Sequence, residues 1–375
     1  MIFIFFCLNV VLEVLLRNGI RLFLRKIRKK RILVVCDKFL AESGAINYIL
    51  DSLDSSNSVE LFDQAIPDPT IEIVGKGLGV LCRVRPDIVI GFGGGSAIDT
   101  AKAMIYFAGV RELVPKPRFV TIPTTSGTGS EVTSAAVITD SETKSKHLIS
   151  SEDILADVAI LDPRLTLSVP PAITANTGMD VLTHALEAYV ANGCNVFSDA
   201  LSEKATELLI KALLKCYRDG KNLEARTLMH EASTLAGMAF NTAGLGLNHS
   251  IAHQLGGTFH IPHGLANAML LNKVIEYNSV NHDIMNKYAT LAYKVQLVGM
   301  NEAPEMAVKT LEELIRSLMC CMDMPASIRE LGISREAYEG QLQNMTDNAL
   351  MDNCLISNPR EAGTEAIKEI LLSIY

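Results

Sequence analysis

The chain has 375 residues, of which 49% are hydrophobic and 20% are charged, and its formal net charge is -8 at pH 7. A chain of this length exceeds one ordinary core, so we expect two domains. The negative charge excludes a global basic field that would hold a polyanion, and no zinc-finger or RNA-recognition motif is visible, so nucleic acid is not the expected partner. Eight cysteines without a CxxC pair indicate reduced thiols and a cytoplasmic protein.

The first 30 residues form an atypical segment. Residues 1–16 are apolar apart from Asn9 and Glu13, and residues 17–31 then carry eight basic side chains. Glu13 interrupts the apolar run too early for a transmembrane helix, and the basic residues follow the run instead of preceding it as in a signal peptide. Three interpretations stay open: an amphipathic basic helix packed on the first domain, a helix contacting a partner or a membrane surface, and a targeting segment. Membrane contact by residues 1–30 is not the favoured one.

From residue 31 onward, short apolar and β-branched runs alternate with helical patterns. Strands are predicted at residues 31–36, 59–62, 87–90, 118–123, 135–140 and 158–161. Helices are expected after the first strand to about residue 53, and from the turn at 67–70 to about residue 84. This alternation predicts an α/β domain with a parallel, doubly wound sheet. From residue 173 the strand signals vanish, and helical periodicity predicts an all-α second domain.

A glycine-rich stretch at residues 91–96 (GFGGGS) follows a predicted strand and opens a predicted helix. Glycine allows close backbone approach, and a helix N-terminus presents free N–H groups to a pyrophosphate. Ser96 stands where a third glycine would complete the standard dinucleotide fingerprint, so an ordinary structural turn remains an alternative. Residues 124–130 (TTSGTGS) also follow a strand and offer hydroxyl and N–H groups to the same ligand, unless they only cap a helix.

Asp37 directly follows the first predicted strand. A carboxylate at this place accepts hydrogen bonds from the adenosine ribose hydroxyls and repels a 2′-phosphate, which favours NAD over NADP. An ordinary turn aspartate is the alternative.

Histidines concentrate in the second half of the chain, with spacings typical of one helix face. Asp180 and His184 are four residues apart, His249 and His253 repeat this spacing, and His263 stands at a likely helix start. Asp180, His184, His249 and His263 together would offer one oxygen and three imidazole nitrogens, a set that suits Fe²⁺ or Zn²⁺ with one position open to substrate. Any one of these histidines alone is more often a core or surface residue.

Other chemistry is less well supported in this region. Residues 249–253 (HSIAH) lack the glutamate of the HExxH protease motif. We interpret Glu187 and His230 as surface or helix-packing residues.

Several strings resemble the iron-dependent (group III) alcohol dehydrogenases. They are residues 93–99 (GGGSAID), 123–131 (PTTSGTGSE), 176–184 (NTGMDVLTH), 246–257 (GLNHSIAHQLGG) and 261–264 (IPHG). The resemblance extends from about residue 31 to residues 357–360 (SNPR). Within the family, the sequence is similar to the propanol dehydrogenases associated with propanediol-utilising bacterial microcompartments.

The resemblance implies an NAD-binding α/β domain over residues 31–165, an all-helical metal-binding and catalytic domain over 166–375, and an active site in the cleft between them. It assigns the metal to Asp180, His184, His249 and His263, with His253 close by but not a ligand. The cofactor contacts that it implies are Asp37, Gly94, Gly95, Ser96, Asp99, Thr124, Thr125, Thr128 and Lys146. We expect a homodimer or higher homo-oligomer in the cytoplasm, or inside a microcompartment with its shell or enzymes as partners.

The expected reaction is a reversible conversion of a short-chain aldehyde into its primary alcohol. The substrate oxygen binds the open metal position, where the cation stabilises the alkoxide, and hydride passes to or from the nicotinamide. Propanal is the favoured substrate, while ethanol, butanol and small diols stay open. His253, one turn from His249, is the candidate for relaying the proton to solvent.

Two other functions are conceivable from the same residues. A lyase similar to dehydroquinate synthase would need basic residues for a phosphorylated substrate, and the sequence around Asp180 and His249 is poor in lysine and arginine. A non-catalytic NAD-binding scaffold would have damaged metal ligands, whereas all four are present.

Overall fold

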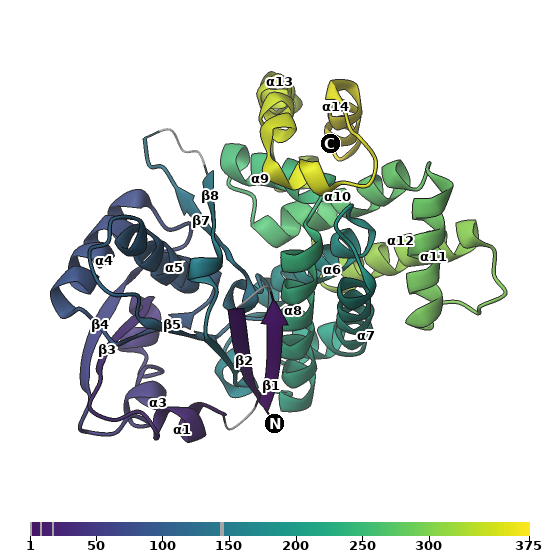
Figure 1. Cartoon of the computed structure of the whole chain (residues 1–375). Coiled ribbons are helices and arrows are strands. Elements are labelled where there is room, and N and C mark those ends of the chain that lie inside the picture. The colour runs from purple at the N-terminus through teal and green to yellow at the C-terminus, as the bar shows by residue number, and fades with distance from the viewer. Residues whose placement is uncertain (1, 8–9, 17–18, 143–145) are drawn as a thin grey trace. The chain divides into compact units, whose positions relative to one another are not determined.

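The computed structural model describes residues 2–7, 10–16, 19–142 and 146–375 (Figure 1). The chain divides into two compact units, Met1–Ser168 and Val169–Tyr375, which we call the first and second units. No helix among the described residues is long and apolar enough to cross a membrane.

The first unit is built on a seven-stranded sheet with the order β1-β2-β9-β6-β5-β3-β4. Its strands are β1 (Ile2–Cys7), β2 (Val10–Leu16), β3 (Arg31–Asp37), β4 (Ser58–Ala65), β5 (Ile88–Gly93), β6 (Arg118–Pro123) and β9 (Val158–Leu161). β1 is antiparallel to β2, and every other neighbouring pair is parallel. The predicted parallel, doubly wound sheet is therefore confirmed.

Helices connect the parallel strands, as parallel pairing requires. They are α1 (Gly19–Leu24), α2 (Lys38–Glu42), α3 (Asn47–Leu50), α4 (Ile71–Val84) and α5 (Gly95–Val110), with 3₁₀ turns η1 (Ser130–Val132), η2 (Glu152–Ile154) and η3 (Pro163–Thr166). The interior strand β5 is buried at all of its positions, which explains why its sequence is continuously apolar instead of alternating.

The strand expected at 135–140 exists but does not join the main sheet. It is β7 (Ala135–Thr139), which pairs antiparallel with β8 (Lys146–Ser150) in a separate two-stranded sheet. Strand propensity alone does not specify the partner of a strand.

The helix expected at the start of the chain is wrong for residues 2–7 and 10–16, although this segment does belong to the first unit, as one interpretation had it. Residues 2–7 and 10–16 are strands, and β2 pairs with β9 from Glu13↔Val158 to Leu16↔Leu161. Among the described residues of this segment, helix is limited to the six residues of α1, and Ile20 and Leu24 are buried against the sheet. A short apolar run fits a buried strand and a helix equally well by periodicity, so the sequence pattern does not distinguish the two. Residues 1, 8–9 and 17–18 of the segment lie outside the described residues.

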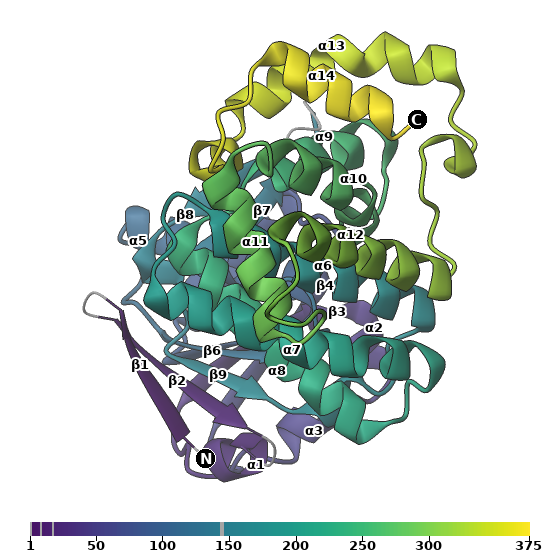
Figure 2. The same ribbon diagram turned by 90° about the vertical axis from the view of Figure 1, so that its right-hand side faces the viewer.

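The second unit is entirely helical, as predicted. It contains α6 (Pro171–Val190), α7 (Val196–Arg218), α8 (Leu223–Ala243), α9 (Leu247–Phe259), α10 (His263–Asn278), α11 (His282–Lys294), α12 (Pro304–Cys321), α13 (Arg335–Met351) and α14 (Thr364–Ser373), with 3₁₀ turns η4 (Arg329–Leu331) and η5 (Asn353–Ser357). Figure 2 shows α13 and α14 lying over α9 and α10. α6 is buried on all sides from Gly178 to Val190, so its polar side chains face other helices instead of solvent.

Candidate active site

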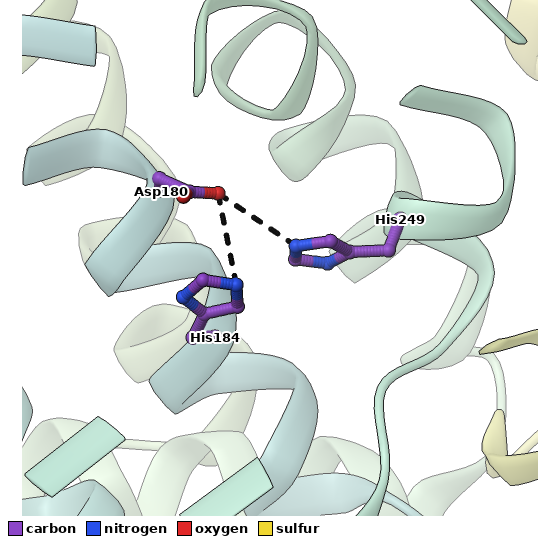
Figure 3. A group of neighbouring side chains, drawn as sticks. All are labelled: Asp180, His184 and His249. Atoms are coloured by element: carbon purple, nitrogen blue, oxygen red, sulfur yellow. Dashed lines mark ion pairs between the residues drawn. The ribbon is translucent and has the colours of Figure 1, made fainter. Parts of the chain in front are cut away.

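A cluster of one carboxylate and three histidines lies inside the second unit. Asp180 and His184 project from α6 one turn apart, and His249 projects from α9 (Figure 3). The Nε2 atoms of His184 and His249 lie 3.8 and 3.7 Å from the same Asp180 Oδ1. His263, the first residue of α10, places its Nε2 3.4 Å from that oxygen. The three histidines predicted as ligands thus each place a ring nitrogen within 4 Å of one oxygen of Asp180.

Three side chains of the cluster are buried, and the fourth is partly exposed. The side chains of His184 and Asp180 are 5% exposed and that of His249 is 1% exposed, whereas that of His263 is 36% exposed. His263 is therefore the least buried of the four side chains.

Close packing of α10 on α6 brings His263 to the cluster. A Cβ atom added to the next residue, Gly264, would lie 1.9 Å from the backbone oxygen of Asn176 in α6. Only glycine permits this approach of helix to helix. The Pro-His-Gly sequence thus places His263 beside Asp180 by bringing the two backbones into contact.

Glu187, which the sequence analysis treated as a surface or packing residue, belongs to the site. It is buried on α6, one turn after His184. Its Oε2 accepts a hydrogen bond from Nδ1 of His249, and its Oε1 accepts one from the backbone N–H of Asn248 at 2.7 Å. A proton held on Nδ1 leaves the lone pair of His249 Nε2 directed at the cluster, as metal ligation requires.

Electrostatics favour ionised groups at the cluster. Burial opposes the ionisation of Asp180, but the neighbouring histidines, His184 first, outweigh it and hold the pKa of Asp180 well below its usual range. Burial lowers the pKa of His249, but the carboxylates of Glu187 and Asp180 reverse this effect and raise it to about 9. The surrounding carboxylates therefore favour positive charge at this point of the site.

Asn267 shows that the donor atoms suit a cation. Its Nδ2 lies 2.8 Å from Asp180 Oδ1, 3.1 Å from His249 Nε2 and 3.2 Å from His263 Nε2. Asn248 donates to Oδ1 of Asn267 at 2.9 Å, so the amino side of the Asn267 amide faces the cluster. Three acceptors directed at one positively polarised group are the arrangement that a divalent cation binds. The residues present therefore fit a metal ion.

His253 lies beside the cluster and is oriented by a residue that the sequence did not suggest. Its ring stacks on that of His263 with centroids 5.4 Å apart, and it meets the His249 ring edge-on at 6.0 Å. Its Nδ1 donates to Oδ2 of Asp352 at 2.8 Å. His230, the other residue set aside earlier, is buried on α8.

The glycine-rich loop of the first unit forms a second candidate binding element. Gly93 ends β5 with a φ of 150°, Gly94 is the N-cap of α5, and Gly95 and Ser96 open the helix. A Cβ atom on Gly95 would lie 2.7 Å from Cγ2 of Thr128. The loop therefore needs glycine at residue 95. It packs directly against the threonine-rich stretch at residues 124–130.

The threonine-rich stretch is held to this loop by further contacts. The backbone N–H of Thr124 donates to the Gly93 oxygen at 3.0 Å. A Cβ atom on Gly94 would meet Oγ1 of Thr125 at 3.3 Å. The two stretches predicted to bind one dinucleotide thus lie side by side, next to a helix N-terminus that favours phosphate.

Asp99 has its carboxylate engaged inside the first unit. It accepts hydrogen bonds from Ser130 Oγ at 2.5 Å and from the Val137 backbone N–H at 3.0 Å. On the next turn, the fully buried Lys102 donates to Thr133 Oγ1 at 3.0 Å and to the Ala135 oxygen at 2.7 Å. Asp99 and Lys102 thus fasten the polar loop and β7 to α5, and the role of Asp99 as a cofactor contact stays a prediction.

Two predicted cofactor contacts lie outside the glycine-rich and threonine-rich stretches and have different surroundings, namely Asp37 and Lys146. Asp37 Oδ1 caps α2 by accepting from Leu40 N–H at 2.8 Å, while its Oδ2 is 3.9 Å from where a Cβ of Gly93 would be. The carboxylate therefore lies beside the glycine-rich loop. Lys146, on β8, forms an ion pair with Asp68 at 2.7 Å. Its contact with a cofactor also remains a prediction.

Two family models match the chain almost from end to end. Residues 17–163 match the model described as iron-containing alcohol dehydrogenase, and residues 174–375 match that described as Fe-containing alcohol dehydrogenase family, C-terminal. The chain belongs to the iron-containing alcohol dehydrogenase family. It is thus an oxidoreductase of the nicotinamide-dependent alcohol dehydrogenase type, as the sequence resemblance implied.

This alcohol dehydrogenase aligns with its relatives over nearly the whole length of both chains. It is 46% identical over 349 residues to the 1-propanol dehydrogenase PduQ of Citrobacter freundii, covering 93% of this chain and 94% of the relative. It is 39% identical to the NADPH-dependent butanol dehydrogenase of Clostridium saccharobutylicum, with 92% of each chain covered.

Solved structures show the same fold. A crystal structure of 1,3-propanediol oxidoreductase is 36% identical and has a TM-score of 0.89, with 98% of each chain covered. Sulfoacetaldehyde reductase from Bifidobacterium kashiwanohense, in complex with NAD⁺, is 27% identical with a TM-score of 0.85 and 96% coverage of each chain.

Sequence reasoning missed three residues of the site in this alcohol dehydrogenase. Sequence spacing could have identified two of them but not the third. Glu187 lies seven residues after Asp180, so helix periodicity placed it on the ligand-bearing face. Asn267 follows His263 by four residues in the same way. Asp352 is 99 residues from His253, and no spacing rule relates them.

Proposed function

We propose that this enzyme interconverts a short-chain aldehyde and its primary alcohol, with propanal as the favoured aldehyde, using NAD(H) and Fe²⁺. The placement of ring nitrogens of His184, His249 and His263 within 4 Å of one oxygen of Asp180 carries the proposal, because three neutral nitrogens and one carboxylate suit Fe²⁺ or Zn²⁺. Zn²⁺ binds such donors more tightly than Fe²⁺, so the ion in the cell depends on supply as well as on ligands.

Support for the substrate class comes from the named relatives. Relatives at 46% and 45% identity are called 1-propanol dehydrogenases, and another is a butanol dehydrogenase. NAD as the cofactor is supported by Asp37 beside the glycine-rich loop, where its charge would repel a 2′-phosphate.

The chain's own residues would prepare the substrate for hydride transfer. A bound divalent cation supplies a Lewis acid for the substrate oxygen, and the nicotinamide supplies the hydride donor or acceptor. Glu187 holds the proton of His249 on Nδ1, so that Nε2 is free to ligate. Asp352 likewise holds Nδ1–H of His253, which leaves Nε2 of His253 to exchange a proton with the substrate oxygen and then with solvent.

The test is the oxidation of NADH by propanal, followed at 340 nm. Anaerobically purified protein is stripped with EDTA and then loaded with Fe²⁺ or, separately, with Zn²⁺. We expect turnover with propanal only after metal is restored, highest with Fe²⁺. Protein that binds metal and NADH but reduces no short aldehyde would overturn the proposal.

We further propose a homo-oligomer that works in the cytoplasm, including the interior of a bacterial microcompartment. The location is supported by the free cysteines among the described residues and by the likeness to PduQ proteins. Light scattering of the purified enzyme tests the oligomer, with a monomeric mass as the contrary result. Co-sedimentation with purified microcompartments tests the location.

A further inference from the structure

A second group of metal-ligating side chains lies next to the cluster around Asp180. His253 on α9, Asp352 at the end of α13 and Cys354 in η5 each offer a donor atom, and these atoms all lie within 4.8 Å of one another. They supply one nitrogen, one oxygen and one sulfur. None of the three is assigned to the metal in the reaction proposed above.

Local structure directs these side chains toward a common point. Asp352 is the N-cap of η5, and its Oδ1 accepts from the Cys354 backbone N–H at 2.9 Å. Its other oxygen, Oδ2, is thereby turned toward His253 Nδ1 at 2.8 Å. Ser250 Oγ donates to the Ala349 oxygen at 2.7 Å and so joins α9 to the last turn of α13. The three donors are therefore preorganised by the fold.

The group is also within reach of ions from solvent. The side chains of His253 and Asp352 are 25% and 16% exposed, and Cys354 is half-buried. A cation would enter without unfolding the helices around it.

We propose that His253, Asp352 and Cys354 form a second divalent-cation site that takes Zn²⁺. Zinc accepts nitrogen, oxygen and sulfur donors at distances of about 2.0–2.3 Å, and three protein ligands with water as the fourth make a common zinc coordination. The thiolate selects zinc over the harder ions Mg²⁺ and Ca²⁺. Binding releases the protons of His253 Nδ1 and of the Cys354 thiol, so zinc replaces the hydrogen bond that now joins His253 Nδ1 to Oδ2 of Asp352.

The second site binds more weakly than the first. The His253 ring stacks on that of His263, so two cations would be held by neighbouring rings and would repel each other. Asp180 and Asp352 belong to different groups, so no carboxylate bridges the two ions. Zinc therefore fills the cluster around Asp180 first.

Zinc at the second site inhibits the enzyme, an inference that rests on the proposed function. In the proposed reaction, His253 relays a proton while Asp352 accepts a hydrogen bond from the Nδ1–H of His253. Zinc on Nδ1 removes this hydrogen bond and adds a positive charge beside the ring. Turnover of the metal-loaded enzyme should fall as zinc rises beyond one equivalent per chain.

The decisive measurement is the number of zinc ions bound per chain. The full chain, stripped with a chelator, is dialysed anaerobically against excess free Zn²⁺, and bound metal is counted by mass spectrometry. We expect two ions per chain in the wild type and one in Cys354→Ala. Cys320→Ala, which removes an exposed thiol on α12, is the matched control and should keep two. One ion in the wild type, or two in Cys354→Ala, overturns the proposal.

Cobalt reports on the sulfur ligand directly. The wild type titrated with Co²⁺ should develop a thiolate-to-cobalt absorption band only after the first equivalent, and Cys354→Ala should lack that band. A band in Cys354→Ala would show that another thiol is the ligand.

The number of zinc ions bound per chain can be measured independently of the proposed reduction of propanal. Asp180→Asn should lose the first ion and keep the second, whether or not propanal is reduced. With an active enzyme, Cys354→Ala should keep its turnover and lose the inhibition by excess zinc. Failure of the proposed function and failure of this site are thus separate outcomes.

Discussion

Glu187 governs which nitrogen of His249 carries the proton. Its Oε2 accepts from Nδ1, and its Oε1 accepts from the backbone of Asn248. A glutamine could keep the backbone contact but would present an amino group to Nδ1. His249 would then take the opposite tautomer, with its proton on Nε2 where the cation must bind.

Glu187→Gln should therefore weaken metal binding by about 10–100-fold, the range typical of residues that orient a ligand. Competition with a chelator of known affinity measures the change. Glu224→Gln, at an exposed position on α8, is the control and should bind as the wild type does. Unchanged affinity in Glu187→Gln would show that His249 keeps its tautomer by other means.

Lys102 makes the stability of the first unit depend on pH. Burial lowers its pKa to about 8 from the ordinary value of 10.5, although Asp99 opposes the shift. The folded protein therefore releases this proton at lower pH than the unfolded chain does. Below pH 8 the buried charge is fully present and opposes folding, and this effect is relieved as pH rises to 10.5.

Lys102→Met removes this dependence. The stability of the wild type relative to the variant should increase by about 3 kcal/mol between pH 7 and pH 10.5. Urea unfolding at several pH values measures the difference. The exposed Lys76→Met on α4 should show no such trend. If the difference in stability between the wild type and Lys102→Met stays constant across pH, the lowered pKa of Lys102 is contradicted.

At the scale of elements, the contact between α6 and α10 sets the geometry of the metal centre. Asp180 and His184 lie on one helix, and His263 lies at the start of the other. Gly264 lets the backbones touch at Asn176. Separation of these helices would move His263 away from Asp180 without changing any ligand.

Gly264→Ala should impose that separation. The added methyl group would lie 1.9 Å from a backbone oxygen, which cannot rotate away as a side chain can. We expect a loss of about 1–3 kcal/mol of stability, together with weaker metal binding. Thermal unfolding and metal content measure the two effects. Gly340→Ala, in α13 with no atom within 4 Å of the new methyl group, should be neutral or stabilising. Full metal content in Gly264→Ala would contradict this role for the glycine.

The elements also show how much the sequence could predict. The buried parallel strands β3, β5 and β6 were clear because apolar runs alternate with helices. The i, i+4 spacing of Asp180 with His184 and of His249 with His253 pointed to a metal site, and the family resemblance assigned His263 to it instead of His253. β1 and β2 were missed because a short apolar run has no distinguishing period. The pairing of β7 with β8 and the contact between His253 and Asp352 depend on tertiary structure, which local patterns do not encode.

At the scale of the whole molecule, the two candidate binding elements belong to different units. The glycine-rich loop lies within Met1–Ser168, and all four proposed metal ligands lie within Val169–Tyr375. The ligands come from α6, α9 and α10, so a bound cation would tie three helices of the second unit together.

Metal removal should therefore destabilise the second unit selectively. A ligand present at 1,000 times its Kd stabilises the folded state by about 4 kcal/mol. Calorimetry of stripped and loaded protein should show that metal raises the unfolding transition of the second unit, while NADH raises that of the first. Limited proteolysis of partly unfolded samples assigns the transitions. Identical transitions with and without metal would contradict metal binding at the four ligands.

The position of three site residues on α6 has a consequence for changes of chain length. Asp180, His184 and Glu187 share one face of a continuous helix. One residue inserted between the first two would rotate them relative to each other by about 100° and lengthen the helix by about 1.5 Å. The site would be lost although every ligand remained in the sequence. Insertions should be accepted in a connection such as residues 295–303, between α11 and α12, but not inside α6.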